Sequence, residues 1–252
     1  MSFYLKSFLQ FGTAWFLLWA SAAGQSGGVA PLQALLEPER SEYLLGVPVK
    51  FTASIRNVSS APVLTYSLDD SSPLTEDISF FISEDGSPFH GFRGPQWYAG
   101  DLMDMGQGMI TLKPGETEQA SFSLLWNGPF YTEGRAPTGG FAFFHAGTYF
   151  VKVRVSSKFG DLMSNVVRVV IQQPQRDDAA IWEALKADKG LAQYYDYPDG
   201  AAGQGEKLQQ LLNKYPNSSH AASMKKALAV YARQQAEIDA AKKARGAPQP
   251  RH

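Results

Sequence analysis

The chain of 252 residues contains no cysteine. This absence excludes disulfide bonds, thiol nucleophiles, cysteine zinc sites and lipid attachment through an N-terminal cysteine. Histidine is scarce, with four residues, and no two of them are four positions apart. The sequence also lacks a glycine-rich phosphate loop with lysine, a Gly-x-Ser-x-Gly motif and a His-Glu-x-x-His motif. We therefore expect a protein that is not an enzyme and needs no cofactor.

Charge of either sign is also in short supply. The 23 Lys and Arg residues nearly balance the 24 Asp and Glu residues, which argues against a general nucleic-acid binder. The balance is uneven along the chain, because residues 206–252 hold nine basic side chains and three acidic ones. A basic final helix could contact an acidic protein face or an anionic envelope polymer. Alternatively, Lys242, Lys243 and Arg245 only complement the dipole at a solvated helix end.

The N-terminus has the pattern of an export signal. Lys6 is the only charged residue among the first 36, and residues 11–23 are mostly apolar. The segment ends in Ala-Ser-Ala-Ala at 20–23, which carries the small-x-small pattern of a cleavage site. We expect a signal peptide over 1–23, a flexible leader over 24–31, and a periplasmic or extracellular product without a transmembrane span. The alternative is an uncleaved anchor, although the apolar stretch is shorter than the ~18 residues of a membrane span.

The middle of the chain alternates between apolar and polar residues. In 47–57 the odd positions from Val47 to Ile55 are apolar and the even positions from Lys50 are polar, and 149–156 repeats the pattern. This period of two is typical of strands with one solvated face. Weaker or similar patterns occur at 32–36, 63–68, 78–82, 120–126 and 167–171. About seven strands, with 23 glycines and 15 prolines for turns, predict an antiparallel β-sandwich over residues 32–173.

Several turn and strand segments of the expected sandwich resemble those of a known family. They are Phe51–Asn57, Leu112–Glu116 with its Lys-Pro-Gly-Glu turn, Trp126, Ala146–Tyr149 and Ser164–Val167. Together they resemble landmarks of bacterial immunoglobulin-like domains, and their order is similar to the intracellular-proteinase-inhibitor-like β-sandwich. The resemblance implies an immunoglobulin-like fold and a loop near Arg93 or Arg135 that could inhibit a protease. A tyrosine at the start of a strand, Tyr149, also suits a tyrosine corner, in which the hydroxyl bonds to the backbone upstream.

The pattern changes to a helical period after Gln173. Asp177 and Asp178 are expected to cap a helix with Ile181, Ala184 and Leu185 on its apolar face. A second helix places Leu208, Leu211, Leu212 and Tyr215 on one face and ends at Pro216. Asn217–Ser219 would cap a third, with Met224, Leu228, Tyr231 and Ile238 on its apolar face.

The segment Leu211–Ser218 resembles the turn between helices of tetratricopeptide-like units in bacterial envelope proteins. One such helix pair is too little for a stable solenoid. We therefore expect a small helical appendage over 174–245 that packs on the sandwich or on a partner, and a disordered tail over 246–252.

Two insertions between the expected strands are rich in aromatic residues and arginine. They span 89–109 and 127–147, and loops of this length in a compact domain are usually functional or disordered. Aromatic and arginine side chains at the end of a rigid sandwich form a plausible recognition surface. The candidate contact residues are Arg93, Trp97, Tyr98, Phe130, Tyr131 and Arg135. The alternative is that these rings fold back and cover the end of the sandwich.

A metal site is the competing interpretation of the first insertion. Thioether sulfur suits Cu(I), and Met103, Met105 and Met109 lie close in sequence, with His90 or His145 as further ligands. The alternative is that these methionines fill gaps at the end of the sandwich. Carboxylates also occur in expected loops, where they could hold Ca²⁺, serve a glycosidase or remain solvated. They are Asp69, Asp70, Glu84, Asp85, Asp101 and Asp104.

These patterns together favour an exported, non-catalytic binding or adaptor protein. Its partner would be a protein or an envelope component, contacted by the sandwich loops and the helical appendage. The alternatives are a protease inhibitor that acts through a sandwich loop, and a periplasmic protein that binds copper or a glycan.

Overall fold

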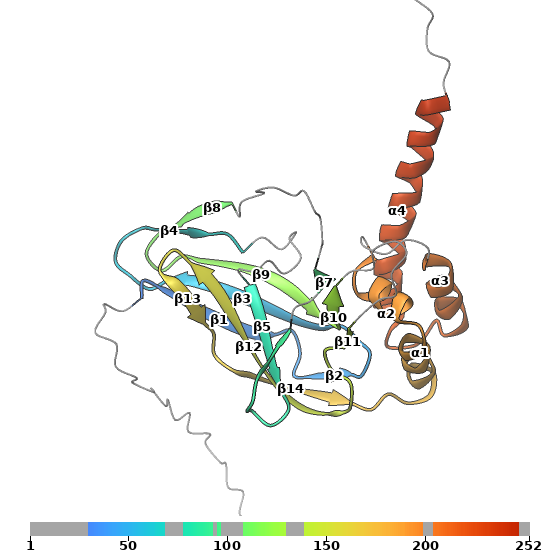
Figure 1. Cartoon of the computed structure of the whole chain (residues 1–252), viewed down its shortest axis with the longest axis horizontal. Helices are drawn as coiled ribbons and strands as arrows, with labels where there is room; N and C mark the ends of the chain where they lie inside the picture. The colour runs from blue at the N-terminus through green and yellow to red at the C-terminus, as the bar shows by residue number, and fades with distance from the viewer. Residues whose placement is uncertain are drawn as a thin grey trace, which may run out of the picture. The chain divides into compact units, whose positions relative to one another are not determined.

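The computed structural model describes residues 30–68, 78–92, 95–96, 108–129, 139–198 and 204–246 (Figure 1). The described residues form strands first and helices afterwards. The strands are β1 (Leu32–Pro38), β2 (Glu42–Leu44), β3 (Val49–Asn57), β4 (Val63–Tyr66), β5 (Ile78–Ser83), β6 (His90–Phe92), β7 (Pro95–Gln96), β8 (Met109–Leu112), β9 (Thr117–Leu124), β10 (Trp126–Pro129), β11 (Gly140–Phe141), β12 (Gly147–Ser157), β13 (Gly160–Met163) and β14 (Val167–Gln172). The helices are α1 (Arg176–Ala187), α2 (Lys189–Asp196), α3 (Gly205–Lys214) and α4 (Ala221–Gly246). The fold is therefore mainly β with C-terminal helices, as predicted, but its strands are more numerous and several are shorter than predicted.

The strands with the clearest alternation are also the best buried. In β3 the side chains of Val49, Phe51, Ala53 and Ile55 are buried, and the side chains between them are partly or fully exposed. β12 alternates in the same way over its eleven residues. Each strand thus presents one apolar face to a core, which is the arrangement that a period of two predicts.

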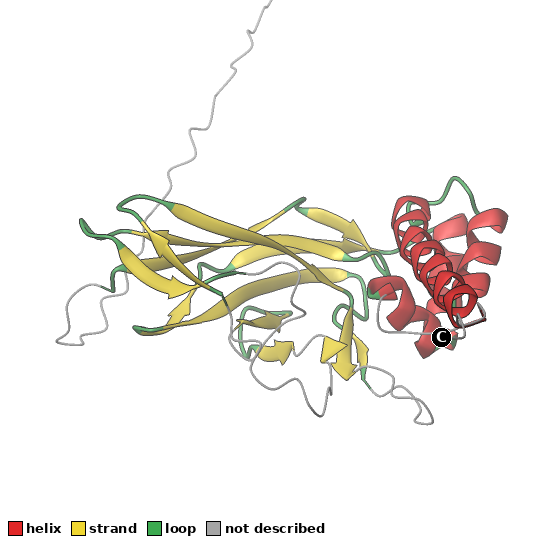
Figure 2. Cartoon of the chain, turned by 90° about the horizontal axis from the view of Figure 1, so that it is seen from above, coloured by secondary structure: helices red, strands yellow, loops and turns green. Residues whose placement is uncertain are grey.

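Two larger sheets carry most of these strands (Figure 2). One has the order β1-β3-β9, and the other has the order β2-β14-β12-β5-β6 with β13 added to β12. β1 lies at an edge of the first of these sheets. Two small sheets, β11-β10-β7 and β4-β8, complete the β part, by which we mean residues 31–172.

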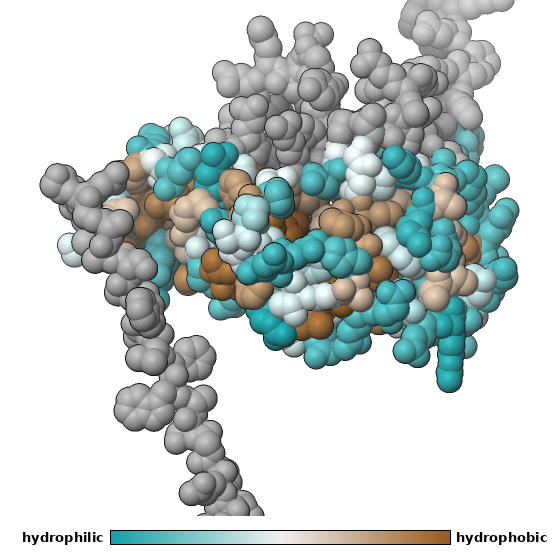
Figure 3. All heavy atoms as spheres, turned by 60° about the horizontal axis from the view of Figure 1, so that its bottom comes forward, coloured by the Kyte–Doolittle hydropathy of each residue, from teal (hydrophilic) through white to brown (hydrophobic). Residues whose placement is uncertain are grey.

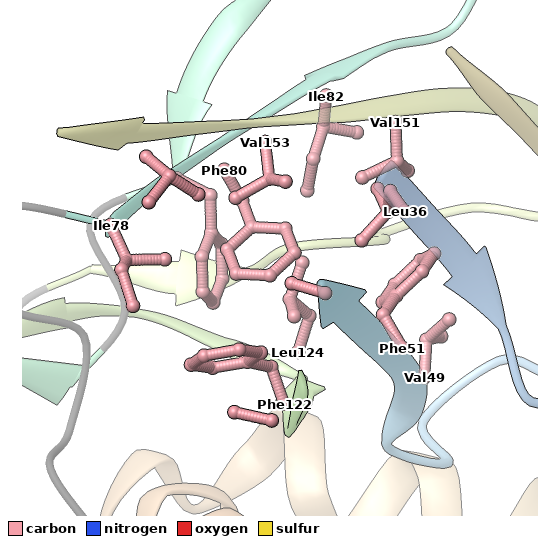
Figure 4. Close-up of a cluster of buried hydrophobic side chains, with 14 of the residues drawn as sticks. Leu36, Val49, Phe51, Ile78, Phe80, Ile82, Phe122, Leu124, Val151 and Val153 are labelled. Carbon is pink, nitrogen blue, oxygen red and sulfur yellow. The ribbon is translucent and has the colours of Figure 1, made fainter. Parts of the chain in front are cut away.

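The main core contains side chains from both larger sheets (Figure 4). Phe51 of β3 and Phe122 of β9 lie near Phe80 of β5, with ring centroids 6.1 Å and 5.4 Å from that of Phe80. Val151 and Val153 of β12 belong to the same buried cluster. Removal of this apolar surface from water is the main force that holds the two sheets together.

Two strand pairs are parallel, which differs from the purely antiparallel prediction. β2 runs parallel to β14, with Tyr43 opposite Ile171, and β7 runs parallel to β10. The reason for the first pair lies between β1 and β2. Pro38 ends β1, after which the chain leaves the first sheet and joins the second at Glu42. Because the chain changes sheets without reversing as a hairpin would, β2 meets β14 in the same direction.

Tyr149 forms the bond that the sequence predicts for it. Its buried hydroxyl donates a hydrogen bond to the carbonyl oxygen of His145, four residues upstream, at 3.0 Å. The bond fixes the segment that leads into β12.

Replacement of this tyrosine tests the bond directly. We expect Tyr149→Phe to lower the free energy of unfolding by about 1 kcal/mol, since one hydrogen bond is lost and the His145 carbonyl loses its partner. Tyr215→Phe is the matched control, because the Tyr215 hydroxyl has no hydrogen bond within the described residues, and it should change stability by less than about 0.5 kcal/mol. Urea unfolding of both variants provides the measurement, and equal losses would contradict the role of the bond.

The helical part, residues 176–246, contains one helix more than the sequence predicts. α2 was not anticipated, whereas α3, and α4 as far as Tyr231, follow the predicted apolar positions; the side chain of Ile238 lies outside the described part. Met224 is buried, and Leu228 and Tyr231 pack against the helical core. Within the described residues, no helix is both long enough and apolar enough to cross a membrane.

The predicted helix caps are wrong. α1 has Gln175 at its N-cap position without a side-chain hydrogen bond, and Asp177 and Asp178 lie inside the first turn. The carboxylate of Asp178 instead accepts hydrogen bonds from the backbone N–H and the hydroxyl of Ser219, at 2.7 Å and 2.9 Å. α4 begins after His220, so Asn217–Ser219 precede its cap position. The aspartate and the serine thus connect the start of α1 to the start of α4.

The β part and the helical part each bury large side chains in the core of the other. Trp182 of α1 belongs to the core of the β part, whereas Leu125 and Trp126 of the β part belong to the core of the helices. The backbone N–H of Trp126 donates to Asp196 at the end of α2, at 2.9 Å. These contacts satisfy the prediction that a single helix pair must pack on another surface.

Candidate functional site

The six predicted contact residues lie outside the described residues. They are Arg93, Trp97, Tyr98, Phe130, Tyr131 and Arg135, and their roles stay predictions. The structure does describe the bases of both insertions. β7 pairs with β10, and β10 pairs with β11, so that Gln96 lies opposite Pro129 and Trp126 opposite Phe141. The two insertions, which are separate in sequence, are therefore paired with each other in one small sheet.

A cavity of about 360 Å³ lies next to this small sheet. Its wall comes from the end of β5 and the turn after it, from β6, from β10, and from the segment between β11 and β12. Glu84, Asp85 and His90 contribute polar side chains, and Phe141 and Phe144 contribute aromatic ones. Concave sites with an apolar wall and a few polar groups are the usual form of a ligand site.

One hydrogen-bonded pair joins Glu84 of the cavity wall to His145 beside it. Nε2 of His145 lies 3.0 Å from Oε2 of Glu84, although the two residues are 61 positions apart. The position of His145 follows from the bond between its carbonyl and the Tyr149 hydroxyl. Burial raises the pKa of Tyr149 above its ordinary value, and the Glu84 charge adds to the rise. The phenol therefore stays protonated and keeps donating to His145.

Phe144 is the most exposed large apolar side chain among the described residues, at 62%. Its ring packs edge-on against His145, with centroids 4.6 Å apart and planes at 71°. Exposed apolar side chains also occur elsewhere, and Figure 3 shows one face on which apolar and hydrophilic patches alternate. The others are Val58, Leu64, Met109, Phe159, Met163 and Val166. Phe144 differs from them because it lies in the wall of the cavity.

A column of aromatic rings links the cavity to the helices. Phe141 lies in the cavity wall, and its ring centroid is 5.4 Å from that of Trp126 and 4.5 Å from that of Trp182. The pKa of Asp196, which accepts the Trp126 N–H, is raised by burial to about 7, against the opposing effect of its hydrogen bonds. Phe141 thus belongs both to the cavity wall and to the contact between the β part and the helical part.

The predicted copper ligands that the structure describes come from different elements, and the copper site stays a prediction. Met109 is an exposed residue of β8, opposite Tyr66 of β4, whereas His90 lies in β6 and His145 contacts Glu84. Met103 and Met105 lie outside the described residues. Among the described residues, no three histidine, aspartate or glutamate side chains are grouped so that they could hold a metal ion.

The structure describes only two of the six predicted loop carboxylates. Glu84 and Asp85 line the cavity, and Asp69, Asp70, Asp101 and Asp104 lie outside the described residues. Sequence reasoning named Glu84 and His145 separately, without joining them, and covered Phe144 only as part of the second insertion. The available signal was the four-residue spacing between His145 and Tyr149, because the tyrosine hydroxyl bonds to the histidine carbonyl and so positions His145.

Comparison with known proteins gives no family. No family model matches the sequence, and no curated protein matches it. Among solved structures, a β-glucosidase from Erythrobacter marinus is similar at 14% identity and a TM-score of 0.31, over 56% of this chain and 15% of the enzyme. The sporulation control protein Spo0M from Bacillus subtilis is similar at 13% identity and a TM-score of 0.30, over 63% of this chain and 56% of that protein.

A CARDB domain from Pyrococcus furiosus, solved with two metal ions, is a third similar structure. It has 9% identity and a TM-score of 0.28, over 56% of this chain and 87% of the domain. The chain spans 15% and 56% of the lengths of the first two structures. Neither a family nor a function follows from these similarities.

Proposed function

We propose that this protein is an exported, non-catalytic binding protein that recognises a protein or an envelope component. The cavity behind Glu84, His145 and Phe144 is the observation that carries the proposal. It is an acidic and aromatic hollow with a solvent-exposed ring at its rim. Binding sites are disproportionately formed by connecting segments that a rigid scaffold positions. The export signal that the sequence predicts supports an encounter with such a partner outside the cytoplasm.

The scaffold in this proposal is an immunoglobulin-like sandwich. The support is the shared core between two larger sheets and the bond from Tyr149 to the backbone upstream, which is typical of a tyrosine corner. The cavity then lies at the end of the sandwich where the two insertions begin.

The tetratricopeptide-like helix pair is proposed as a second contact surface. From Ala232 to the end of α4, every side chain that the structure describes is exposed. Exposed side chains such as these gain little from packing on their own protein and are available to a partner. This part of α4 belongs to the segment with the excess of basic residues.

Photo-crosslinking can test where a partner binds. A benzophenone amino acid would replace Phe144 at the cavity rim, Ala236 on the exposed part of α4, or Val58 at the far end of β3. Val58 is the matched control, because it is 48% exposed and lies outside the cavity wall. In an envelope extract we expect the yield of a discrete adduct from position 144 to exceed that from position 58 at least tenfold.

The adduct from position 236 shows whether α4 contacts the same partner as the cavity. The same adduct mass from positions 144 and 236 supports a partner that spans both surfaces. Equal yields from 144 and 58, or no adduct from either 144 or 236, would contradict the proposed function.

A further inference from the structure

The electrostatic balance of the cavity limits what it can bind. Its described lining includes two carboxylates, Glu84 and Asp85, and no lysine or arginine. Glu84 is paired with His145. In the described part of the chain, the Asp85 carboxylate has neither a hydrogen bond nor an ion pair. A ligand that enters the cavity therefore displaces water from an unpaired negative charge.

A hydroxyl in the wall is also without a partner. Ser83 is 3% exposed and lies in the cavity lining, but no hydrogen bond of its hydroxyl is formed within the described structure. Its oxygen is not one of the fully buried polar atoms that lack a partner, so the hydroxyl is open to the cavity and can bond to water or to a ligand there. It could accept a hydrogen bond from a ligand that carries several donors.

The aromatic side of the cavity favours the same kind of ligand. The ring of Phe144 is exposed beside the carboxylates, and the ring of Phe141 forms part of the inner wall. An aromatic face attracts an ammonium group through its quadrupole, and the alkyl chain that carries the ammonium packs on the ring edges. Asp85 is exposed, so a neutral ligand would gain nothing from its charge, and an anion would be repelled.

We propose that the cavity binds a primary ammonium group carried on an alkyl chain. In this geometry Asp85 pairs with the charge, Ser83 accepts one of its N–H donors, and Phe144 covers the alkyl chain. The ammonium group belongs either to a free diamine or to a lysine side chain of a partner polypeptide. The inference rests on the proposed function, because it names the ligand chemistry of the same cavity.

Titration of the purified protein with 1,5-diaminopentane and with 1,5-pentanediol tests the charge requirement. The two probes match in length and differ in their end groups, and isothermal calorimetry measures Kd for each. We expect the diamine to bind at least tenfold more tightly than the diol. Asp85→Asn should raise the Kd of the diamine about tenfold, and Phe144→Leu should raise it about threefold.

The control variant is Asp177→Asn, which removes an exposed carboxylate in the first turn of α1, away from the cavity lining. It should leave the Kd of the diamine unchanged. Equal affinities for diamine and diol, equal effects of Asp85→Asn and Asp177→Asn, or no binding of the diamine would each overturn the inference.

Two peptides distinguish the possible sources of the ammonium group. Acetyl-Gly-Lys-Gly-amide carries the lysine side chain, and the same peptide with norleucine lacks only the charge. A lower Kd for the lysine peptide than for the diamine assigns a polypeptide ligand, and the reverse order assigns a free amine. If no amine binds but the adduct from position 144 forms, the ligand class fails while the proposed function stands.

Discussion

Gly46→Ala is expected to lower the free energy of unfolding by about 3 kcal/mol or more. Gly46 lies in the turn between β2 and β3 with φ of +85°, a conformation that costs an alanine about 1 kcal/mol. A Cβ atom at this position would also lie 2.6 Å from Cε3 of Trp182. The tryptophan is 3% exposed and its other contacts include Phe141, so the ring has no free space to move into. Overpacking of this kind costs a further 1–3 kcal/mol, roughly.

Gly115→Ala separates the backbone cost from the packing cost. Gly115 also has a positive φ, +79°, but a Cβ atom there would have no neighbour within 4 Å. This control should lose only about 1 kcal/mol. Urea unfolding followed by tryptophan fluorescence gives both values. Equal losses in the two variants would show that Trp182 does not hold the helical part against the turn.

The position of Gly46 explains why this contact matters for the cavity. The turn belongs to the β part, and Trp182 belongs to α1, so the added methyl group would separate the two parts where they meet. The ring of Trp182 lies against Phe141, which forms part of the cavity wall. A shift of α1 would therefore reach the cavity through a single aromatic neighbour.

Local patterns in the sequence were sufficient for the principal strands. The alternation around Phe51 and Val153 predicted β3 and β12, because each strand buries one face and the period of two records that burial directly. Turn residues were equally informative, since Lys113–Glu116 form the turn between β8 and β9. A strand of three residues such as β2 is too short to give a period.

Long-range contacts explain what the sequence could not predict. Asp178 resembles a helix cap locally, but its partner is Ser219, 41 residues away. α2 is eight residues long and is stabilised by the burial of Leu191, Tyr194 and Tyr195 in the helical core, which only tertiary packing supplies. The cavity likewise depends on contacts between distant segments, because Glu84 and His145, 61 positions apart, meet only after β5 and β12 have paired in one sheet.

The second prediction concerns a buried histidine and the dependence of stability on pH. His220 is fully buried at the start of α4, and its Nδ1 lies 3.1 Å from the Tyr195 hydroxyl. In the part of the chain that the structure describes, its Nε2 has no hydrogen-bond partner. Burial lowers the pKa of His220 to about 4, although the charge of Asp178 opposes the shift. The folded protein therefore holds this imidazole neutral at pH values where an unfolded chain would protonate it.

The sign of the effect follows from proton binding. Between pH 6.5, the ordinary histidine value, and pH 4, the unfolded chain binds a proton that the folded chain does not. The contribution of His220 to stability is therefore complete above pH 6.5 and is lost as the pH falls. Asp196 acts in the opposite direction, because its raised pKa of about 7 makes the folded chain bind the extra proton. The unmodified protein shows only the sum of the two effects.

Comparison with His220→Gln isolates the histidine. Glutamine cannot bind a proton and still offers an oxygen to the Tyr195 hydroxyl, and both proteins retain Asp196, whose contribution cancels in the difference. On going from pH 7.5 to pH 5 we expect the unmodified protein to lose about 2 kcal/mol relative to the variant. Urea unfolding at the two pH values gives this difference. The comparison with Asp196→Asn should give a difference of the opposite sign. From pH 7.5 to pH 5 the unmodified protein should gain stability relative to that variant. A histidine that is protonated in the folded state would instead give a difference near zero, because folding would then leave its proton binding unchanged.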